Sequence, residues 1–525
     1  MKQKIKNLAL ITFSGEGMSI AKHFKDDIGD EGKVIVGIIE DQADIYTQEE
    51  LKKMKGEGKD PSDEGEDGKT KKLRLSGYEG ILDTYSADSV VEFLKKQEDK
   101  ESWFVFCDMN YCFKYATMLS EFMPHGIFPT EEQRAMESDR ERAKEFIHEN
   151  YPDVAKERVW ECKTVDEGMK LIESAGELLV LKGNNPDAPT IVPPTDDIET
   201  SNEILLNALE ENKELYNAGG MIFEAKLTDA IELTPERCYY NGEEIFTSLD
   251  FETKRKYAGD VGSELFGCGT DIVLMTDMDD KINKVAFPPI VDELAQKAKG
   301  MFYWDLSLLI SKASGKMYPG EFCANRVGWD SFPSEMDGVS PVDFFTDIVN
   351  YRNPLEGKKA SCSVRVFSDE KDGGNCLGGV KIIFPEDIEK CVWPYDAKME
   401  NGELVTVGYD PSVAVITSSG SDFASAVNTL YDYASKFALA TKRWGYRSKG
   451  DFLDDSYCSS LVTRYNYAVD KGLITGYQPY VREGNDDRVQ ELHRSYGKKI
   501  KDMETSHSND MKGLRDEITA ILHGD

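Results

Sequence analysis

The sequence predicts a multidomain fold that combines α/β and α+β parts, and three observations lead to this prediction. At 525 residues the chain is too long for a single hydrophobic core. Up to about residue 128, apolar strand-like runs alternate with helical segments, as in a parallel α/β domain. After residue 350, short strands separated by turns precede one long helix, which indicates a smaller α+β domain.

The composition is that of an acidic globular protein. Lys and Arg number 63 against 97 Asp and Glu, and the formal charge of −34 argues against a nucleic-acid-binding surface, because phosphates would be repelled. A local basic pocket for a phosphorylated small molecule is compatible with this charge. An acidity that serves only solubility or salt adaptation fits equally well.

The ten cysteines show no CxxC pair, which predicts neither a zinc site nor a disulfide framework and fits a reducing compartment. The N-terminal run MKQKIKNLALITF leads into SGEG rather than a cleavage site and is interpreted as a first strand. No apolar run is long enough to cross a membrane. We therefore expect a cytoplasmic protein, monomeric or dimeric, with neither nucleic-acid nor membrane partners.

The N-terminal domain is expected to begin with a strand over residues 6–13, a glycine-containing turn, a helix, and a second strand over residues 34–40. The GEG turn at Gly15–Gly17 places backbone N–H groups at a helix start, where an anion could bind; a plain tight turn explains it equally. A further strand, SWFVFCD, ends in Asp108.

The next segment carries two candidate binding strands. Residues 130–150 have helical spacing, and a strand–helix–strand pattern then ends in LLVLKG. Lys182, at the end of this apolar run, is costly to bury unless it meets an anion, so it is a candidate phosphate ligand; a lysine that snorkels to solvent is the alternative. The strand MIFEAKL follows, and the dipeptide Asn241–Gly242 between two β-rich runs predicts a hairpin.

The stretch from Phe302 to Asp330 predicts two strands joined by a polar turn. These strands would place Asp305 and Glu321 side by side at one end of a sheet, with Asn325 and Arg326 just behind. Hard oxygen ligands beside an arginine suit a magnesium ion that bridges nucleotide phosphates. An ordinary hairpin with solvated carboxylates is the alternative.

Taken together, these segments resemble glycinamide ribonucleotide synthetase (phosphoribosylamine–glycine ligase), a family of the ATP-grasp superfamily. The resemblance runs in order over roughly residues 6–453. It includes the helix that carries Lys144, the LLVLKG strand, the MIFEAKL hinge, the loop SLDFETKRKYAGDVGSELFGCG, and GEFCANRVGWD, which is similar to the family's EFNARFGDPE. The family's asparagine aligns with Cys323 or Asn325; we choose Asn325, because a thiol is a poor magnesium ligand.

The resemblance implies a domain organisation and an activity. It implies a pre-ATP-grasp domain (1–128), a two-lobed ATP-grasp domain (129–345, lobe A about 129–200, lobe B about 201–345), a C-terminal α+β domain (350–453) and a helical extension (454–525). The implied activity is ATP-dependent ligation of a carboxylate, such as glycine, to an amine through an acyl phosphate, as in purine biosynthesis. The implied site residues are Lys144, Lys182, Glu224 and Lys226 for ATP; Asp305, Glu321 and Asn325 for Mg²⁺ or Mn²⁺; and Arg326, Lys254 and Asp250 for catalysis.

The loop after Lys182 departs from the family. GNNPDAPTIVPP has three prolines by Pro193 where the family has a glycine-rich phosphate loop, and proline lacks an N–H group. Two hypotheses therefore stand. The first is a ligase with a divergent amine, such as a modified nucleotide; the second is a catalytically inactive descendant that serves as a binding or assembly protein.

Overall fold

The computed structural model describes residues 3–40, 78–184, 190–253, 255–258, 261–264, 270–322, 331–368, 377–408, 410–454 and 460–481. The chain divides into two compact units, Met1–Pro479 and Tyr480–Asp525. All the described helices and strands lie in the first unit. None of the described helices is long and apolar enough to cross a lipid bilayer.

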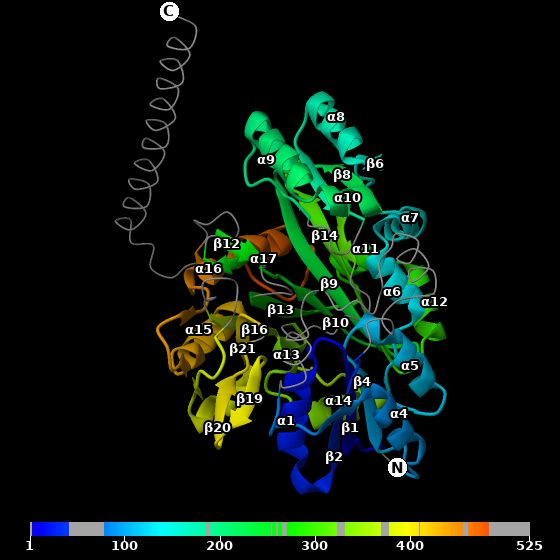
Figure 1. The fold of residues 1–525 in the computed structure, drawn as a ribbon, viewed down its shortest axis with the longest axis vertical. Coiled ribbons are helices and arrows are strands. Elements are labelled where there is room, and N and C mark those ends of the chain that lie inside the picture. Colours follow the sequence, from blue (N-terminus) through cyan, green and yellow to red (C-terminus); the bar gives the residue numbers. More distant parts are fainter. Residues whose placement is uncertain are drawn as a thin grey trace, which may run out of the picture. The chain divides into compact units, whose positions relative to one another are not determined.

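A parallel sheet forms the N-terminal part, blue to cyan in Figure 1. Its strands lie in the order β3-β2-β1-β4-β5, and each neighbouring pair is parallel. The elements are β1 (Asn7–Thr12), α1 (Met18–Ile28), η1 (Gly29–Glu31), β2 (Lys33–Ile38), β3 (Thr84–Ser86), α4 (Ala87–Lys95), β4 (Trp103–Cys107), η3 (Asn110–Cys112), α5 (Phe113–Ser120) and β5 (Gly126–Ile127). Alternate residues of β1 enter two cores: Leu8 and Leu10 pack with α1, and Ala9 and Ile11 pack with α4 and α5. The α/β architecture predicted for this part is confirmed.

The helical segment expected over residues 130–150 is two helices, α6 (Glu131–Ser138) and α7 (Arg140–Asn150). Thr130 caps α6, and its hydroxyl accepts a hydrogen bond from the Gln133 N–H group. Asp139 leaves the helical backbone, with φ −110° and ψ 95°, and its carboxylate accepts a hydrogen bond from the Arg142 N–H group at 3.1 Å. An aspartate that bonds a nearby backbone N–H group competes with a continuous helix, which explains the break.

A small antiparallel sheet follows, in the strand order β6-β8-β7, and we call it with its helices lobe A. Its elements are β6 (Val159–Cys162), α8 (Val165–Ala175), β7 (Leu179–Gly183), α9 (Ile198–Glu211), α10 (Lys213–Gly219) and β8 (Met221–Ala225). Leu181, Leu205 and Phe223 belong to its core. The middle strand β8 lies beyond residue 200, where lobe A is expected to end from the sequence. The domain boundaries taken from the sequence stay predictions.

The N-terminal sheet continues into a large mixed sheet of 14 described strands. The join is one parallel pair, Ile127 of β5 with Met301 of β14. The elements of this part, lobe B, are β9 (Ala230–Tyr240), β10 (Glu243–Asp250), β11 (Arg255–Tyr257), β12 (Val261–Glu264), β13 (Thr270–Thr276), α11 (Lys281–Ala286), α12 (Pro289–Lys297), β14 (Met301–Ser311) and β15 (Met317–Phe322). Asn241 and Gly242 have φ of 48° and 84°, as a tight hairpin turn requires, so the predicted β9–β10 hairpin is confirmed.

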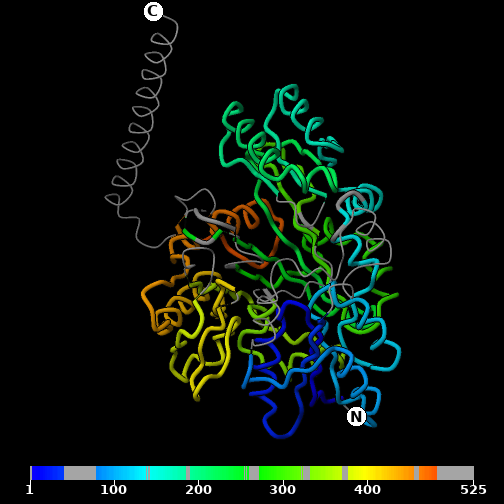
Figure 2. The backbone as a smooth tube through the Cα atoms, viewed as in Figure 1, coloured from blue at the N-terminus to red at the C-terminus, as the bar shows by residue number. Residues whose placement is uncertain are grey.

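The C-terminal part extends the same sheet, because β16 pairs antiparallel with β13. In Figure 2 its yellow and orange segment lies beside the green strands of lobe B. The elements are α13 (Ser331–Met336), α14 (Pro341–Val349), β16 (Ala360–Ser368), β17 (Ile382–Ile383), η4 (Glu386–Cys391), β18 (Val392–Pro394), β19 (Ala397–Glu400), β20 (Glu403–Thr406), β21 (Ser412–Gly420), α15 (Phe423–Ala434), β22 (Ala438–Leu439), β23 (Trp444–Gly445), α16 (Gly450–Leu453) and α17 (Leu461–Asp470). Short strands followed by a long helix confirm the α+β character predicted for this part.

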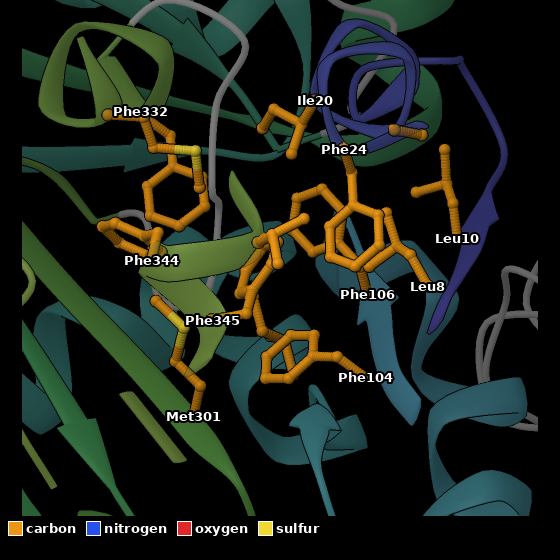
Figure 3. Close-up of a cluster of buried hydrophobic side chains, with 14 of the residues drawn as sticks. Leu8, Leu10, Ile20, Phe24, Phe104, Phe106, Met301, Phe332, Phe344 and Phe345 are labelled. Atoms are coloured by element: carbon orange, nitrogen blue, oxygen red, sulfur yellow. The ribbon is translucent and has the colours of Figure 1, made fainter. Parts of the chain in front are cut away.

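The largest core joins segments that are far apart in the sequence. Figure 3 shows Phe104 and Phe106 of β4 meeting Phe345 of α14. The rings of Phe104 and Phe345 stack with their centroids 4.3 Å apart. Helix α14 therefore packs on the N-terminal sheet, and the sheet that carries the N-terminus shares its core with the residues that follow lobe B.

Candidate functional site

Two lysines and a glutamate from three elements form one ion-pair cluster, which we call the lysine cluster: Lys144, Lys182 and Glu224. Lys182 Nζ lies 2.7 Å from Glu224 Oε2, and Lys144 Nζ lies 2.5 Å from Glu224 Oε1. The β7–β8 register explains the first contact, because Val180 pairs with Glu224 and Lys182 is two residues further along the same face. Lys144 reaches the same carboxylate from α7. The structure thus brings together three of the four residues predicted to bind ATP.

The lysine cluster is largely shielded from solvent. The lysine side chains are 17% and 16% exposed and the Glu224 side chain is 10% exposed. Burial acts to raise the pKa of Glu224, but the Lys182 and Lys144 ammonium groups outweigh it and hold that pKa below its usual value. Two ammonium groups that share one anion in a poorly solvated position can equally share a phosphate group.

A second glutamate holds Lys144 from its other side. Glu157 Oε1 lies 2.5 Å from Lys144 Nζ, and Glu157 Oε2 lies 3.2 Å from His148 Nε2. The Glu157 side chain is 8% exposed. Sequence reasoning missed Glu157 and His148, because Glu157 stands in an irregular segment between α7 and β6 and no spacing links it to Lys144.

Helix α7 also joins the lysine cluster to the β14–β15 hairpin. The Phe146 ring lies edge-on to Trp304 of β14 and to Phe322 of β15, with centroids 6.3 Å away in both cases. Trp304 Nε1 donates a hydrogen bond to the Tyr151 hydroxyl at 3.1 Å. The helix that carries Lys144 is therefore fixed to the residues that adjoin Asp305 and position 321.

The hairpin predicted from Phe302 onward is confirmed as the antiparallel pair β14–β15. Leu306 pairs with Phe322, and the register of the hairpin shifts directly after this pair, between Leu306 and Leu308. Asp305 pairs directly with Glu236 of β9 and is 7% exposed. The side chain of Glu321 is not among those the structure describes.

Asp305 borders a buried group of carboxylates and hydroxyls. Tyr303 OH lies 2.9 Å from both Glu236 Oε2 and Glu335 Oε1, and Ser248 Oγ lies 3.0 and 2.7 Å from the same two oxygens. Burial, with the Glu335 and Asp305 charges, raises the pKa of Glu236. Burial also raises the pKa of Glu335 to about 7. Sequence reasoning missed both glutamates, since only the strand register and the docking of α13 bring them to Asp305.

Two acidic side chains, Asp305 and Glu236, meet at this point of the sheet. Asp305 and Glu236 offer carboxylate oxygens, which Mg²⁺ prefers over nitrogen or sulfur. Within the described part of the chain, no three or more His, Cys, Asp or Glu side chains are grouped to hold a metal ion. The predicted ligand Asn325 lies outside the described residues, so the metal set of Asp305, Glu321 and Asn325 stays a prediction.

The predicted catalytic loop begins at Asp250, the last residue of β10, which is 2% exposed. Two arginines of the C-terminal part hold the backbone around this loop. Arg447 Nη1 donates to the Arg255 carbonyl at 2.6 Å, and Arg464 Nη1 donates to the Glu252 carbonyl at 2.7 Å. Lys254 and Arg326 lie outside the described residues, so their catalytic roles stay predictions.

Lys226 does not join the lysine cluster. Its ammonium group donates to the carbonyls of Pro193 and Thr195, each at 2.9 Å, and pairs with Asp196 at 2.9 Å. It therefore holds the end of the proline-containing loop. Nearby, Ile191 pairs with Leu181 of β7 through two backbone hydrogen bonds of 3.0 and 2.7 Å.

No family's sequence profile matches this chain, and no curated protein matches it in sequence. The fold is similar to that of phosphoribosylamine–glycine ligase from Thermotoga maritima, with a TM-score of 0.55 at 15% identity over 84% of this chain and 99% of that one. It is similar to the biotin carboxylase domain of 2-oxoglutarate carboxylase from Hydrogenobacter thermophilus in complex with magnesium ADP, with a TM-score of 0.53 at 12% identity over 90% and 96%. A third is biotin carboxylase from Campylobacter jejuni, with a TM-score of 0.52 at 14% identity over 90% and 98%. At these identities the likeness establishes the fold.

Proposed function

Because the chain has the ATP-grasp fold of these ligases and carboxylases, we propose that it is an ATP-dependent carboxylate–amine ligase. The carboxylate is an amino acid such as glycine, and the amine is either phosphoribosylamine or a divergent amine. The protein works in the cytoplasm.

The lysine cluster carries this proposal. Lys144, Lys182 and Glu224 lie on three elements far apart in the sequence, yet the two ammonium groups lie within 2.5 and 2.7 Å of one carboxylate. Such a convergence of cations is what a polyphosphate requires. Glu224 lies between the two ammonium groups, where a phosphate group of ATP would bind. ATP binding would therefore separate both lysines from Glu224.

The reaction divides into two displacements. A carboxylate oxygen of the substrate attacks the γ-phosphorus of ATP, the bond to the β-phosphate oxygen breaks, and ADP leaves. The amine then attacks the acyl carbon, inorganic phosphate leaves, and the amine nitrogen loses a proton. Positioning and charge neutralisation dominate phosphoryl transfer, so most of the work falls to bound cations and fixed donors.

The residues take these roles in the proposal. Lys144 and Lys182 would hold the ATP phosphates once Glu224 releases them, and Glu224 and Lys226 would then contact the nucleoside. Asp305, Glu321 and Asn325 would hold Mg²⁺ or Mn²⁺, which when bound neutralises charge on the phosphates. Arg326 stabilises charge on the transferred group, while Asp250 and Lys254 order the substrate loop.

Nucleotide binding and ADP release test the proposal. Mg–ATP should raise the melting temperature, since a ligand that binds only the folded state stabilises it. Lys182→Met should abolish this shift, whereas Lys213→Met, which removes an exposed lysine paired with Glu210, should preserve it. If the wild-type protein shows neither a shift nor ADP release with any carboxylate and amine, the ligase proposal fails.

One observation favours a second candidate, a nucleotide-binding protein without ligase activity. Residues 191–195, which follow the described start of this loop, are held by the Leu181–Ile191 backbone pair and by Lys226, whereas residues that close over phosphates must move. An Mg–ATP shift in melting temperature without ADP release over a broad panel of amines would favour this candidate.

A further inference from the structure

The N-terminal sheet has a topological switch point between β1 and β4. The chain leaves β1 toward β2 on one side, and it leaves β4 toward β5 on the other. In open α/β sheets, ligands bind outside the carboxyl ends of the strands at such a point, and a helix N-terminus there receives anions such as phosphate. The turn after β1 and the start of α1 occupy this position, and the sequence marks it as a candidate anion site.

Three backbone donors of this turn are already used within the protein. The Gly17 N–H group donates to Asp108 Oδ2 at 2.7 Å. The Gly15 N–H group donates to Thr12 Oγ1 at 2.8 Å, and the Met18 N–H group donates to the Gly15 carbonyl at 3.2 Å. Three N–H groups that could hold a phosphate therefore point to partners in the chain.

The Asp108 carboxyl group is the acceptor at this helix start. Asp108 follows β4, is 0% exposed, and its Oδ1 lies 3.7 Å from Cys112 Sγ. Gly17 itself packs tightly against the core, because a Cβ atom there would lie 2.7 Å from Leu10 and from Phe106. Glu16, 7% exposed, brings another carboxylate that would repel a phosphate.

We infer that Asp108 closes the switch point to phosphate, so that the amine used by this protein carries no phosphate group at the N-terminal sheet. The statement about the amine rests on the proposed ligase function; the exclusion of phosphate by Asp108 does not. Phosphoribosylamine bound with its phosphate at this turn is thereby excluded. The amines that this turn favours are unphosphorylated ones, such as amino acids and amino sugars.

Phosphate binding tests the role of Asp108. The full-length protein is titrated with inorganic phosphate and with ribose 5-phosphate, with ribose as the neutral control, while saturating Mg–ADP occupies the nucleotide site. Wild type should bind neither phosphate up to about 10 mM, and Asp108→Ala should gain ribose 5-phosphate affinity by about tenfold or more, since it frees the Gly17 N–H group. Asp108→Asn keeps a side-chain oxygen that can accept from the Gly17 N–H group, so this variant should still not bind ribose 5-phosphate.

Asp108→Ser serves as the opening variant if Asp108→Ala does not fold, because a shorter side chain also vacates the position. Ribose 5-phosphate binding by wild type that neither opening variant strengthens would overturn the inference. Absence of Mg–ADP binding would instead refute the proposed function. The titrations with inorganic phosphate and ribose 5-phosphate would still test Asp108, because they do not require a bound nucleotide.

Matched amines test the substrate class. ADP release by wild type with glycine is compared for glucosamine against glucosamine 6-phosphate, and for ethanolamine against phosphoethanolamine. The unphosphorylated member of a pair should stimulate release more strongly. Stimulation about tenfold stronger by the phosphorylated member, a difference of about 1.4 kcal/mol, would overturn the inference.

Discussion

Glu224 joins both lysines of the lysine cluster, so its removal leaves two ammonium groups facing each other. We expect Glu224→Gln to lower the free energy of unfolding at pH 7 by about 1–3 kcal/mol, between the values typical of exposed and of fully buried ion pairs. Chemical denaturation measures the change. Glu177→Gln, which removes the partner of the exposed Arg158, is the matched control and should cost less than about 0.5 kcal/mol.

The contribution of Glu224 should also depend on pH in a definite direction. Its pKa in the folded protein is lowered by Lys182 and Lys144 against the effect of burial. Its stabilising effect is therefore complete above the unfolded-state pKa of about 4.3 and is lost as the pH falls through the lower folded-state value. A gap between wild type and Glu224→Gln that stayed constant from neutral pH to about pH 3 would contradict the ion-pair assignment.

Asp108 should show the opposite dependence on pH. Burial and the Glu16 carboxylate raise its pKa to about 7, so the folded state keeps a proton that the unfolded state has lost above about pH 4. The free energy of unfolding should fall between about pH 4 and pH 7, by up to ~4 kcal/mol from this group. Asp108→Asn lacks the titration, and denaturation of both proteins across this range measures the difference. Parallel pH profiles would contradict the assignment.

At the scale of elements, α7 positions Lys144 and depends on the Asp139 cap. Asp139→Ala should cost about 1 kcal/mol of stability and also weaken Mg–ATP binding, because the first turn of α7 leads directly to Lys144. Thr130→Ala removes the cap of α6 and is the matched control. It should cost a similar amount of stability and leave the Mg–ATP affinity close to that of wild type. Equal affinity losses in both variants would show that α7 has no special part in binding.

Local signals predicted many elements, and tertiary contacts decided the rest. The strand–turn–helix–strand start and the turn at Asn241–Gly242 follow from glycine positions and short-range patterns. The break at Asp139 was not predicted, because aspartate within a helical pattern gives no sign of whether its carboxylate will cap a second helix. Within the site, Lys182 and Asp305 stand out as charges in apolar runs, whereas Glu157 and Glu236 depend on register and docking.

At the scale of the whole molecule, the N-terminal part, lobe B and the C-terminal part share one mixed sheet, and the N-terminal sheet shares a core with α14. The pair β13–β16 joins segments about ninety residues apart, and Phe345 of α14 stacks on Phe104 of the N-terminal sheet. The sequence pattern of a strand does not predict which other strand it pairs with, because the pattern is the same whichever neighbour the strand joins. Coupling of this kind is expected to make the N-terminal sheet and the segments that share its core unfold together.

Two parts of the segment after residue 454 are expected to contribute differently to stability. Residues 461–477 contact lobe B closely: the Ile282 N–H group donates to the Leu473 carbonyl at 3.1 Å, and Tyr477 OH donates to the Met275 carbonyl at 2.5 Å. The Tyr465 ring stacks on Phe423 of α15 with the centroids 4.7 Å apart. A chain that ends at Asp454 would expose these surfaces, whereas one that ends at Pro479 keeps the whole compact unit.

We therefore expect residues 1–479 to melt within about 2 °C of the full chain, and residues 1–454 to melt at least about 10 °C lower or to aggregate, because several buried contacts are lost together. Calorimetry of the three chains under one condition makes the comparison, and the Mg–ATP shift should follow the same order, since Arg464 holds the backbone beside the predicted catalytic loop. If residues 1–454 were as stable as the full protein, the packing of α17 on lobe B would contribute nothing measurable to stability.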